Sequence, residues 1–91
     1  MSAAPAPFHD RDGFIWLDGK LVPWREANIH ILTHAMHYAS AVFEGERAYG
    51  GQIFKLTEHS ERLVASGKML DFDIPYSVAE IDKACIDTLK A

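Results

Sequence analysis

The stretch from residue 42 to residue 49 constrains the fold most, because its side chains alternate in character. In an extended strand every second side chain lies on the same face. One face would then carry two aromatic rings, an arginine and a glycine: Phe43, Gly45, Arg47 and Tyr49. The other would carry Val42, Glu44, Glu46 and Ala48. The first face suits a planar ligand with an anionic group, but it also describes a half-buried strand with two core aromatics and a solvated arginine.

Two tight turns are predicted. Asp18-Gly19 lies between the apolar runs 14–17 and 20–22. This predicts a hairpin with a type I′ turn, which requires positive φ at both central residues. Pro23 cannot donate to a ladder, so a strand end or sheet edge is expected there. Gly50-Gly51 predicts a second turn, leading into residues 52–55.

Two helices are predicted in the second half of the chain. Thr57 is expected to cap the first, which carries Leu63 and Leu70 at helical spacing. Ser77-Val78-Ala79-Glu80 is a capping box at the start of the second, with Tyr76 and Ile81 placed to form a hydrophobic staple. An apolar stripe follows at Ile81, Ala84, Cys85 and Leu89. Residues 28–40 fit either an irregular segment or a short helical turn capped by Thr33.

Composition excludes several classes of function. A single cysteine rules out an internal disulfide. The net charge is −4 and the basic residues are scattered, which argues against nucleic acid or anionic membrane as a partner. No apolar run approaches the roughly 20 residues of a membrane span, and the N-terminus lacks the pattern of a signal peptide. The cytoplasm is therefore the expected compartment.

Arg62 and the histidines are the other candidates for chemistry. The planar guanidinium of Arg62 could bind a phosphate with two parallel hydrogen bonds, or it could form an i,i+4 ion pair with Glu58. His30, His34 and His37 are spaced four and three apart, and Glu44 could supply a further metal ligand. A histidine-rich metal-binding module is thus the alternative from a different class of function.

The Val-Phe-Glu-Gly-x-Arg core at 42–47 has a hairpin before it at 15–19 and a helix after it at 58–63. In this order, over residues 14–90, the chain resembles fold-type IV pyridoxal-phosphate enzymes, and most closely the branched-chain amino acid aminotransferases. The resemblance implies a small N-terminal α+β domain over residues 13–91, with an antiparallel sheet and two helices, after a mobile arm over 1–12. It also implies a homodimer or higher homo-oligomer that transaminates leucine, isoleucine and valine with 2-oxoglutarate.

The resemblance assigns roles to individual residues. Arg62 matches the arginine that binds the cofactor phosphate. Tyr38 and Phe43 match residues that line the pocket for the substrate side chain, and the residue matching Arg47 lies close by. The histidine at the position of His34 is not a metal ligand in that family.

The resemblance also implies that the chain is incomplete. The lysine that holds pyridoxal phosphate lies downstream in the family, and none of the lysines here matches it: Lys20, Lys55, Lys68, Lys83 and Lys90. The 91-residue chain is therefore expected to be an inactive N-terminal part. A D-amino acid or amine transaminase, or aminodeoxychorismate lyase, are alternatives of the same fold. Ala39, where glycine is usual, and Glu46, where an apolar residue is usual, depart from the family pattern.

Overall fold

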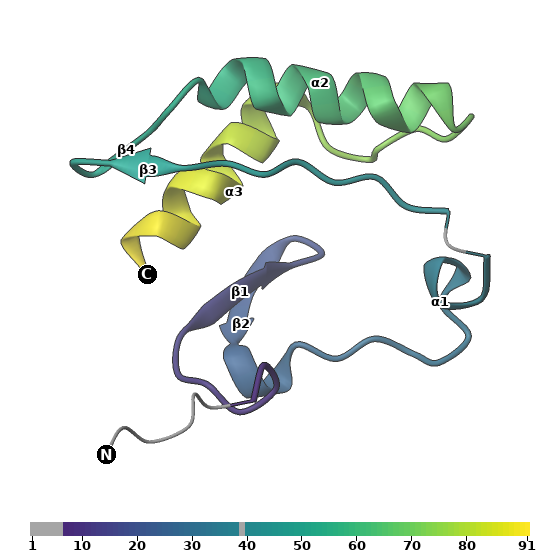
Figure 1. Cartoon of the computed structure of the whole chain (residues 1–91), viewed down its shortest axis with the longest axis horizontal. Helices are drawn as coiled ribbons and strands as arrows, with labels where there is room; N and C mark the ends of the chain where they lie inside the picture. Colours follow the sequence, from purple (N-terminus) through teal and green to yellow (C-terminus); the bar gives the residue numbers. More distant parts are fainter. Residues whose placement is uncertain (1–6, 39) are drawn as a thin grey trace.

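The computed structural model describes residues 7–38 and 40–91, without the side chains of His34 and His37 (Figure 1). Its elements follow in the order β1 (Phe14–Leu17), β2 (Lys20–Pro23), a 3-10 helix (Trp24–Glu26), α1 (His34–Tyr38), β3 (Ala48–Tyr49), β4 (Gln52–Ile53), α2 (Leu56–Met69) and α3 (Val78–Lys90). The fold is α+β, with two small antiparallel sheets and two long helices, as the sequence predicts. No helix in the described part of the chain is long and apolar enough to cross a bilayer.

The first hairpin forms as predicted. Strands β1 and β2 pair antiparallel, with Ile15 opposite Val22. The turn residues Asp18 and Gly19 have φ of 45° and 105°, which is the positive φ at both positions that a type I′ turn requires. Strand β2 ends at Pro23, also as predicted. Local turn chemistry therefore suffices to predict this hairpin.

The predicted arm over residues 1–12 lies partly outside the described residues, which begin at residue 7. From there on, the chain contacts the end of the first hairpin. The indole Nε1 of Trp24 donates a hydrogen bond to the carbonyl of Phe8. The guanidinium of Arg25 contacts Asp10 at 2.7 Å and Asp12 at 2.8 Å. The boundary of the domain at residue 13 stays a prediction.

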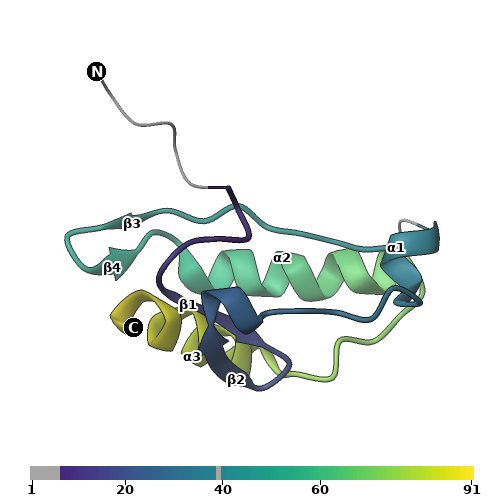
Figure 2. The same cartoon turned by 90° about the horizontal axis from the view of Figure 1, so that it is seen from below.

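The predicted strand over residues 42–49 is wrong for most of its length. Only Ala48 and Tyr49 pair, with Ile53 and Gln52, around the predicted turn at Gly50-Gly51. The preceding residues run as an open segment beside α2 (Figures 1 and 2). Alternation survives in part, because Glu44 is half-buried while Phe43 is exposed. The face with Glu44 is therefore turned toward the protein, where it meets α2, and the interpretation of Phe43 and Tyr49 as core aromatics is wrong.

Helix α2 begins at Leu56, one residue before the predicted cap. Its N-cap residue is Lys55, in a left-handed conformation with φ of 51°. The Thr57 hydroxyl instead donates to Asp82 Oδ2 at 2.8 Å, so the prediction of a Thr57 cap is wrong. The buried Ser60 hydroxyl donates to Asp82 Oδ1 at 2.5 Å. One carboxylate of α3 therefore holds two hydroxyl groups of α2.

Helix α3 begins with the predicted capping box. The Ser77 hydroxyl accepts a hydrogen bond from the Glu80 amide at 3.1 Å, and the Ser77 amide donates to Glu80 Oε1 at 3.0 Å. Tyr76, just before the cap, packs edge-on against Trp16 of β1 at 5.1 Å between ring centroids. Its hydroxyl donates to Asp18 Oδ1 at 2.9 Å. The first hairpin is thereby attached to the start of α3.

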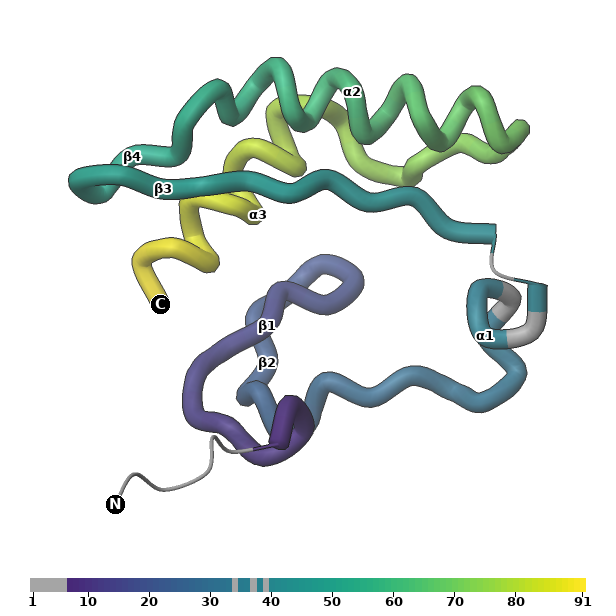
Figure 3. The backbone as a smooth tube through the Cα atoms, viewed as in Figure 1, coloured from purple at the N-terminus to yellow at the C-terminus, as the bar shows by residue number. Residues whose placement is uncertain are grey.

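Between the hairpin and the helices, the chain makes a long excursion. Residues 27–33 lead away from β2 to α1, and residues 40–47 then run back toward β3 beside α2 (Figure 3). The predicted helical turn after Thr33 is present as α1. Large apolar side chains along this excursion are exposed, among them Ile29, Ile31, Leu32 and Met36.

Candidate functional site

Glu44, His59 and Arg62 form a hydrogen-bonded cluster between the open segment and α2. Arg62 Nε donates to Glu44 Oε2 at 2.9 Å, and Arg62 Nη2 donates to Glu44 Oε1 at 2.7 Å. His59 Nδ1 lies 2.7 Å from the same Oε1. His59 and Arg62 are three residues apart on α2, so they share one face of the helix. Glu44 reaches this face because the alternation of the open segment turns it inward.

The carboxylate is the innermost group of the cluster. The Glu44 side chain is 10% exposed, whereas that of Arg62 is 66% exposed. Hydrogen bonds from Arg62, and then from His59, lower the pKa of Glu44 from 4.5 to about 2. The Glu44 carboxylate in turn raises the pKa of Arg62. Both groups therefore stay charged over the whole neutral range.

The tautomer of His59 follows from this charge state. An ionised carboxylate can only accept hydrogen bonds, so His59 Nδ1 must carry the proton that it donates to Glu44. The same nitrogen lies 3.3 Å from Arg62 Nη2 and, being a donor, cannot accept from it. Within the described part of the chain, the second Nη2 hydrogen and both Nη1 hydrogens of Arg62 thus have no acceptor. A guanidinium has two edges, and here only the Nε/Nη2 edge is used by Glu44.

This arrangement suits an anion. The Nη1/Nη2 edge offers two parallel N–H groups, the geometry that binds carboxylate or phosphate oxygens in pairs. The carboxylate that Arg62 contacts is that of Glu44, eighteen residues away, and not that of Glu58, the partner considered from sequence. The prediction that Arg62 binds the phosphate of a cofactor is compatible with this geometry and stays a prediction.

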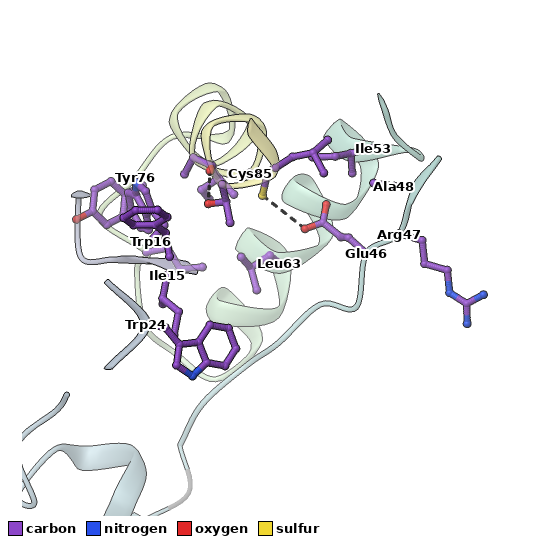
Figure 4. Close-up of a pocket in the computed structure, with 16 residues that line it drawn as sticks. Ile15, Trp16, Trp24, Glu46, Arg47, Ala48, Ile53, Leu63, Tyr76 and Cys85 are labelled. Carbon is purple, nitrogen blue, oxygen red and sulfur yellow. Dashed lines mark hydrogen bonds between the residues drawn. The ribbon is translucent and has the colours of Figure 1, made fainter. Parts of the chain in front are cut away.

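The other predicted site residues are exposed: Phe43 and Arg47 on the open segment, and Tyr38 at the end of α1. Phe43 is 87% exposed, and Tyr38 is 72% exposed. Arg47 is exposed, and its guanidinium points away from the neighbouring cavity (Figure 4). Their assignment to a substrate pocket therefore stays a prediction.

The metal-binding alternative gains no support from the part of the chain that the structure describes. Within it, no group of three or more histidine, cysteine, aspartate or glutamate side chains lies close enough to hold a metal ion. The side chains of His34 and His37 lie outside that part. The imidazole Nδ1 of His30 accepts a hydrogen bond from the Leu32 amide at 3.0 Å. Glu44, the proposed further ligand, is held by Arg62 and His59.

A cavity of about 640 Å³ lies between β1, α3 and the chain around β3 and β4. Its walls are mostly apolar, with Ile15, Trp16, Trp24, Ile53, Leu63 and Leu89 among them (Figure 4). The Cys85 thiol lies at the wall and donates to Glu46 Oε2 at 3.6 Å. Burial, and then the charge of Glu46, raises the pKa of Cys85 to about 11. The thiol is therefore protonated at neutral pH, in agreement with a packing role instead of a nucleophilic one.

Sequence reasoning missed Glu44 and His59 as partners of Arg62. Two signals were present: the alternation that puts Glu44 opposite Phe43, and the i,i+3 spacing of His59 and Arg62. Neither signal shows that the two segments meet. Glu46, which departs from the family pattern, is exposed, and its carboxylate accepts a hydrogen bond from the Cys85 thiol.

Comparison with known proteins gives one consistent result, although no protein-family model matches the chain. It is 55% identical over 71 residues to a probable branched-chain-amino-acid aminotransferase of Rickettsia typhi, covering 78% of this chain and 25% of that protein. It is 52% identical over 79 residues to the branched-chain-amino-acid aminotransferase of Pseudomonas aeruginosa, covering 82% of this chain and 26% of that protein.

Solved structures give the same result. The branched-chain aminotransferase of Thermoproteus uzoniensis, determined with norvaline, superposes with a TM-score of 0.83 at 39% identity, over 89% of this chain and 29% of that one. A second branched-chain amino acid aminotransferase, complexed with N-(5'-phosphopyridoxyl)-L-glutamate, gives a TM-score of 0.82 at 39% identity, over 88% of this chain and 29% of that one. The chain spans about a quarter of the length of the curated relatives. In sequence and in fold, it therefore corresponds to the N-terminal part of the branched-chain aminotransferases.

Proposed function

We propose that this chain is the N-terminal part of a pyridoxal-phosphate-dependent transaminase that converts leucine, isoleucine and valine to their 2-keto acids, with 2-oxoglutarate as the amino acceptor. The observation that carries the proposal is the identity of 52% over 79 residues to a protein named branched-chain-amino-acid aminotransferase. We further propose that the enzyme is cytoplasmic and works as a homodimer or higher homo-oligomer.

Arg62 is the residue proposed to hold the cofactor. Its Nη1/Nη2 edge, which no described residue occupies, and its 66% exposure are what a contact with a phosphate outside this chain requires. A relative of similar fold is described as bound to a phosphopyridoxyl compound, which supports the choice of cofactor. When bound, pyridoxal phosphate supplies an electron sink for the chemistry at the substrate Cα. Arg62 would contribute to binding and orientation, not to proton transfer.

Tyr38 and Phe43 are proposed to line the pocket for the substrate side chain. Both rings are mostly exposed, Phe43 to 87% and Tyr38 to 72%. Aromatic walls suit a leucine-like side chain, because apolar pockets gain affinity by removing hydrocarbon surface from water. We propose Arg47, which lies on the same segment as Phe43, as a polar neighbour of that pocket.

The chain alone is proposed to be inactive. A lysine that holds the cofactor must lose its proton, which requires burial or cationic neighbours. Lys55 lies over the Phe54 ring at 5.7 Å, at the exposed start of α2. Lys83 pairs with the Asp87 carboxylate at 2.6 Å, and its side chain is 76% exposed. Neither lysine has the burial that the chemistry requires.

The test is transamination by the protein expressed from its complete gene and supplied with pyridoxal phosphate. We expect turnover of leucine, isoleucine and valine with 2-oxoglutarate, and little turnover of D-alanine or aminodeoxychorismate. The 91-residue chain, assayed in parallel, should show none. Turnover of D-alanine without turnover of the three branched L-amino acids would overturn the substrate assignment.

A further inference from the structure

We propose that Glu44 and His59 are positioning residues that hold the guanidinium of Arg62 in the orientation that binds the cofactor phosphate. This inference rests on the proposed function and deepens it, because it adds the two groups that would make Arg62 a preformed phosphate site. Neither residue needs to touch the cofactor.

The paired contact with Glu44 fixes the orientation of the Arg62 guanidinium. Glu44 accepts from Nε and Nη2 of Arg62 at 2.9 and 2.7 Å, which fixes the plane of the guanidinium and directs its other edge outward. A single hydrogen bond would leave the group free to rotate, whereas a paired contact does not. The contact of the Nε/Nη2 edge with Glu44 therefore fixes the orientation of the exposed Nη1/Nη2 edge.

Glu44 is itself held in place by burial and by His59. Its carboxylate is only 10% exposed and accepts a further hydrogen bond from His59 Nδ1 at 2.7 Å. His59 is 19% exposed and lies on the same helix as Arg62. Both residues therefore donate to Glu44 from one face of α2. The order of burial runs from Glu44 through His59 to Arg62, which is the order expected when inner groups position an outer one.

Two effects oppose each other when an anion binds. A free arginine loses side-chain freedom on binding, which costs roughly twofold to twelvefold in affinity for one ordered side chain. Glu44 removes this cost in advance, but its own negative charge repels the phosphate. The exposed edge of Arg62 lies in a medium of high dielectric constant, where repulsion across the guanidinium is weak and is screened by salt. Positioning therefore outweighs repulsion, and loss of Glu44 should weaken phosphate binding.

The experiment compares two ligands of the protein expressed from its complete gene: pyridoxal phosphate, and pyridoxal, which lacks the phosphate. Glu44→Ala should lower affinity for pyridoxal phosphate by roughly twofold to twelvefold and leave affinity for pyridoxal unchanged. Glu44→Gln keeps one acceptor oxygen and should recover part of the loss. His59→Asn should give a smaller loss of the same kind. Glu58→Gln is the matched control, because it removes a carboxylate one turn before Arg62 on α2, and it should change neither affinity.

Three results would overturn the proposal. Equal loss of affinity for both ligands would mean that Glu44 supports the fold and not the phosphate site. A gain in affinity for pyridoxal phosphate would mean that Glu44 competes with the cofactor for Arg62. Unchanged affinities for both ligands would mean that Arg62 binds the phosphate without being oriented by Glu44. If Glu44→Ala fails to fold, the same comparison on Glu44→Gln decides between these results.

Arg62→Ala separates this inference from the proposed function. If it abolishes the preference for pyridoxal phosphate over pyridoxal while Glu44→Ala and Glu44→Gln do not, Arg62 binds phosphate unaided and only the positioning role is lost. If wild-type protein binds no pyridoxal phosphate and transaminates nothing, the proposed function and this inference are both wrong.

Discussion

The hydroxyl of Ser60 and the carboxylate of Asp82 join the two long helices at 2.5 Å, in a part of the protein where Ser60 is only 2% exposed. Asp82 also accepts from the Thr57 hydroxyl at 2.8 Å. One acidic side chain thus satisfies two donors on the neighbouring helix. This contact sets how α2, and with it Arg62, lies over α3.

Asp82→Ala should therefore destabilise the protein. It leaves the buried Ser60 hydroxyl without its acceptor, at a cost of about 1–3 kcal/mol. Thermal unfolding and hydrogen exchange at the amides of α2 and α3 would report the loss. Asp87→Ala is the control, because it removes only the exposed pair with Lys83 and should cost about 0.5 kcal/mol or less. Equal effects of the two substitutions would contradict this account.

The free energy of unfolding should fall in acid, in part because Glu44 becomes protonated. Its pKa is lowered from 4.5 to about 2 in the folded protein, so its contribution to stability is complete above pH 4.5. That contribution is lost as the pH falls from 4.5 toward 2, when the folded protein takes up the proton. The difference in the free energy of unfolding between wild type and Glu44→Gln should shrink over this range. A difference independent of pH would show that the Glu44 charge contributes nothing to stability.

Gly67→Ala should destabilise α2 even though alanine favours helices. A Cβ at this position would lie 3.1 Å from the Phe72 ring and 3.2 Å from the Ile74 side chain, closer than normal packing allows. Gly67 is buried, so these side chains have little room to move, and overpacking of about 1–3 kcal/mol exceeds the gain in helix propensity of about 1 kcal/mol. Gly45→Ala, with nothing within 4 Å of its Cβ, should be close to neutral. Urea unfolding of both variants would test the contrast.

Phe43→Ala should alter substrate preference more than cofactor binding. If the ring forms one wall of the pocket, kcat/KM for leucine should fall by about tenfold or more, since even one methylene is worth roughly tenfold in an apolar pocket. The loss for glutamate should be smaller, because its polar side chain depends less on an apolar wall. Cofactor content, read from absorbance, should stay normal. An equal loss for every amino donor would assign Phe43 to the fold instead.

The features predicted correctly from sequence are those fixed by neighbours along the chain. The turn at Asp18-Gly19 and the capping box at Ser77–Glu80 both depend on residues within a few positions of one another. Thr57 shows the limit, since its hydroxyl could serve the start of its own helix but instead donates to Asp82, 25 residues later. A propensity for capping cannot compete with a tertiary acceptor that the sequence does not reveal.

The candidate site also depends on tertiary contacts that the local sequence does not reveal. Roles for Arg62, Phe43, Tyr38 and Arg47 were predicted from the resemblance and stay predictions, and the alternation around Glu44 was visible in the sequence. The strand predicted there did not form, because a strand requires a partner and residues 42–47 run beside a helix. The contact of Glu44 with Arg62 spans 18 residues of sequence and depends on that placement. Only the folded chain brings the two together.

The bond between the Tyr76 hydroxyl and Asp18 has a consequence during synthesis. It joins a hairpin near the start of the chain to a residue 58 positions later. At translation rates of about 5–20 residues per second, Tyr76 is synthesised roughly 3–12 seconds after Asp18. Through that interval the Trp16 ring has no Tyr76 to pack against. The nascent hairpin therefore keeps the Trp16 side of its surface exposed until the start of α3 has been made.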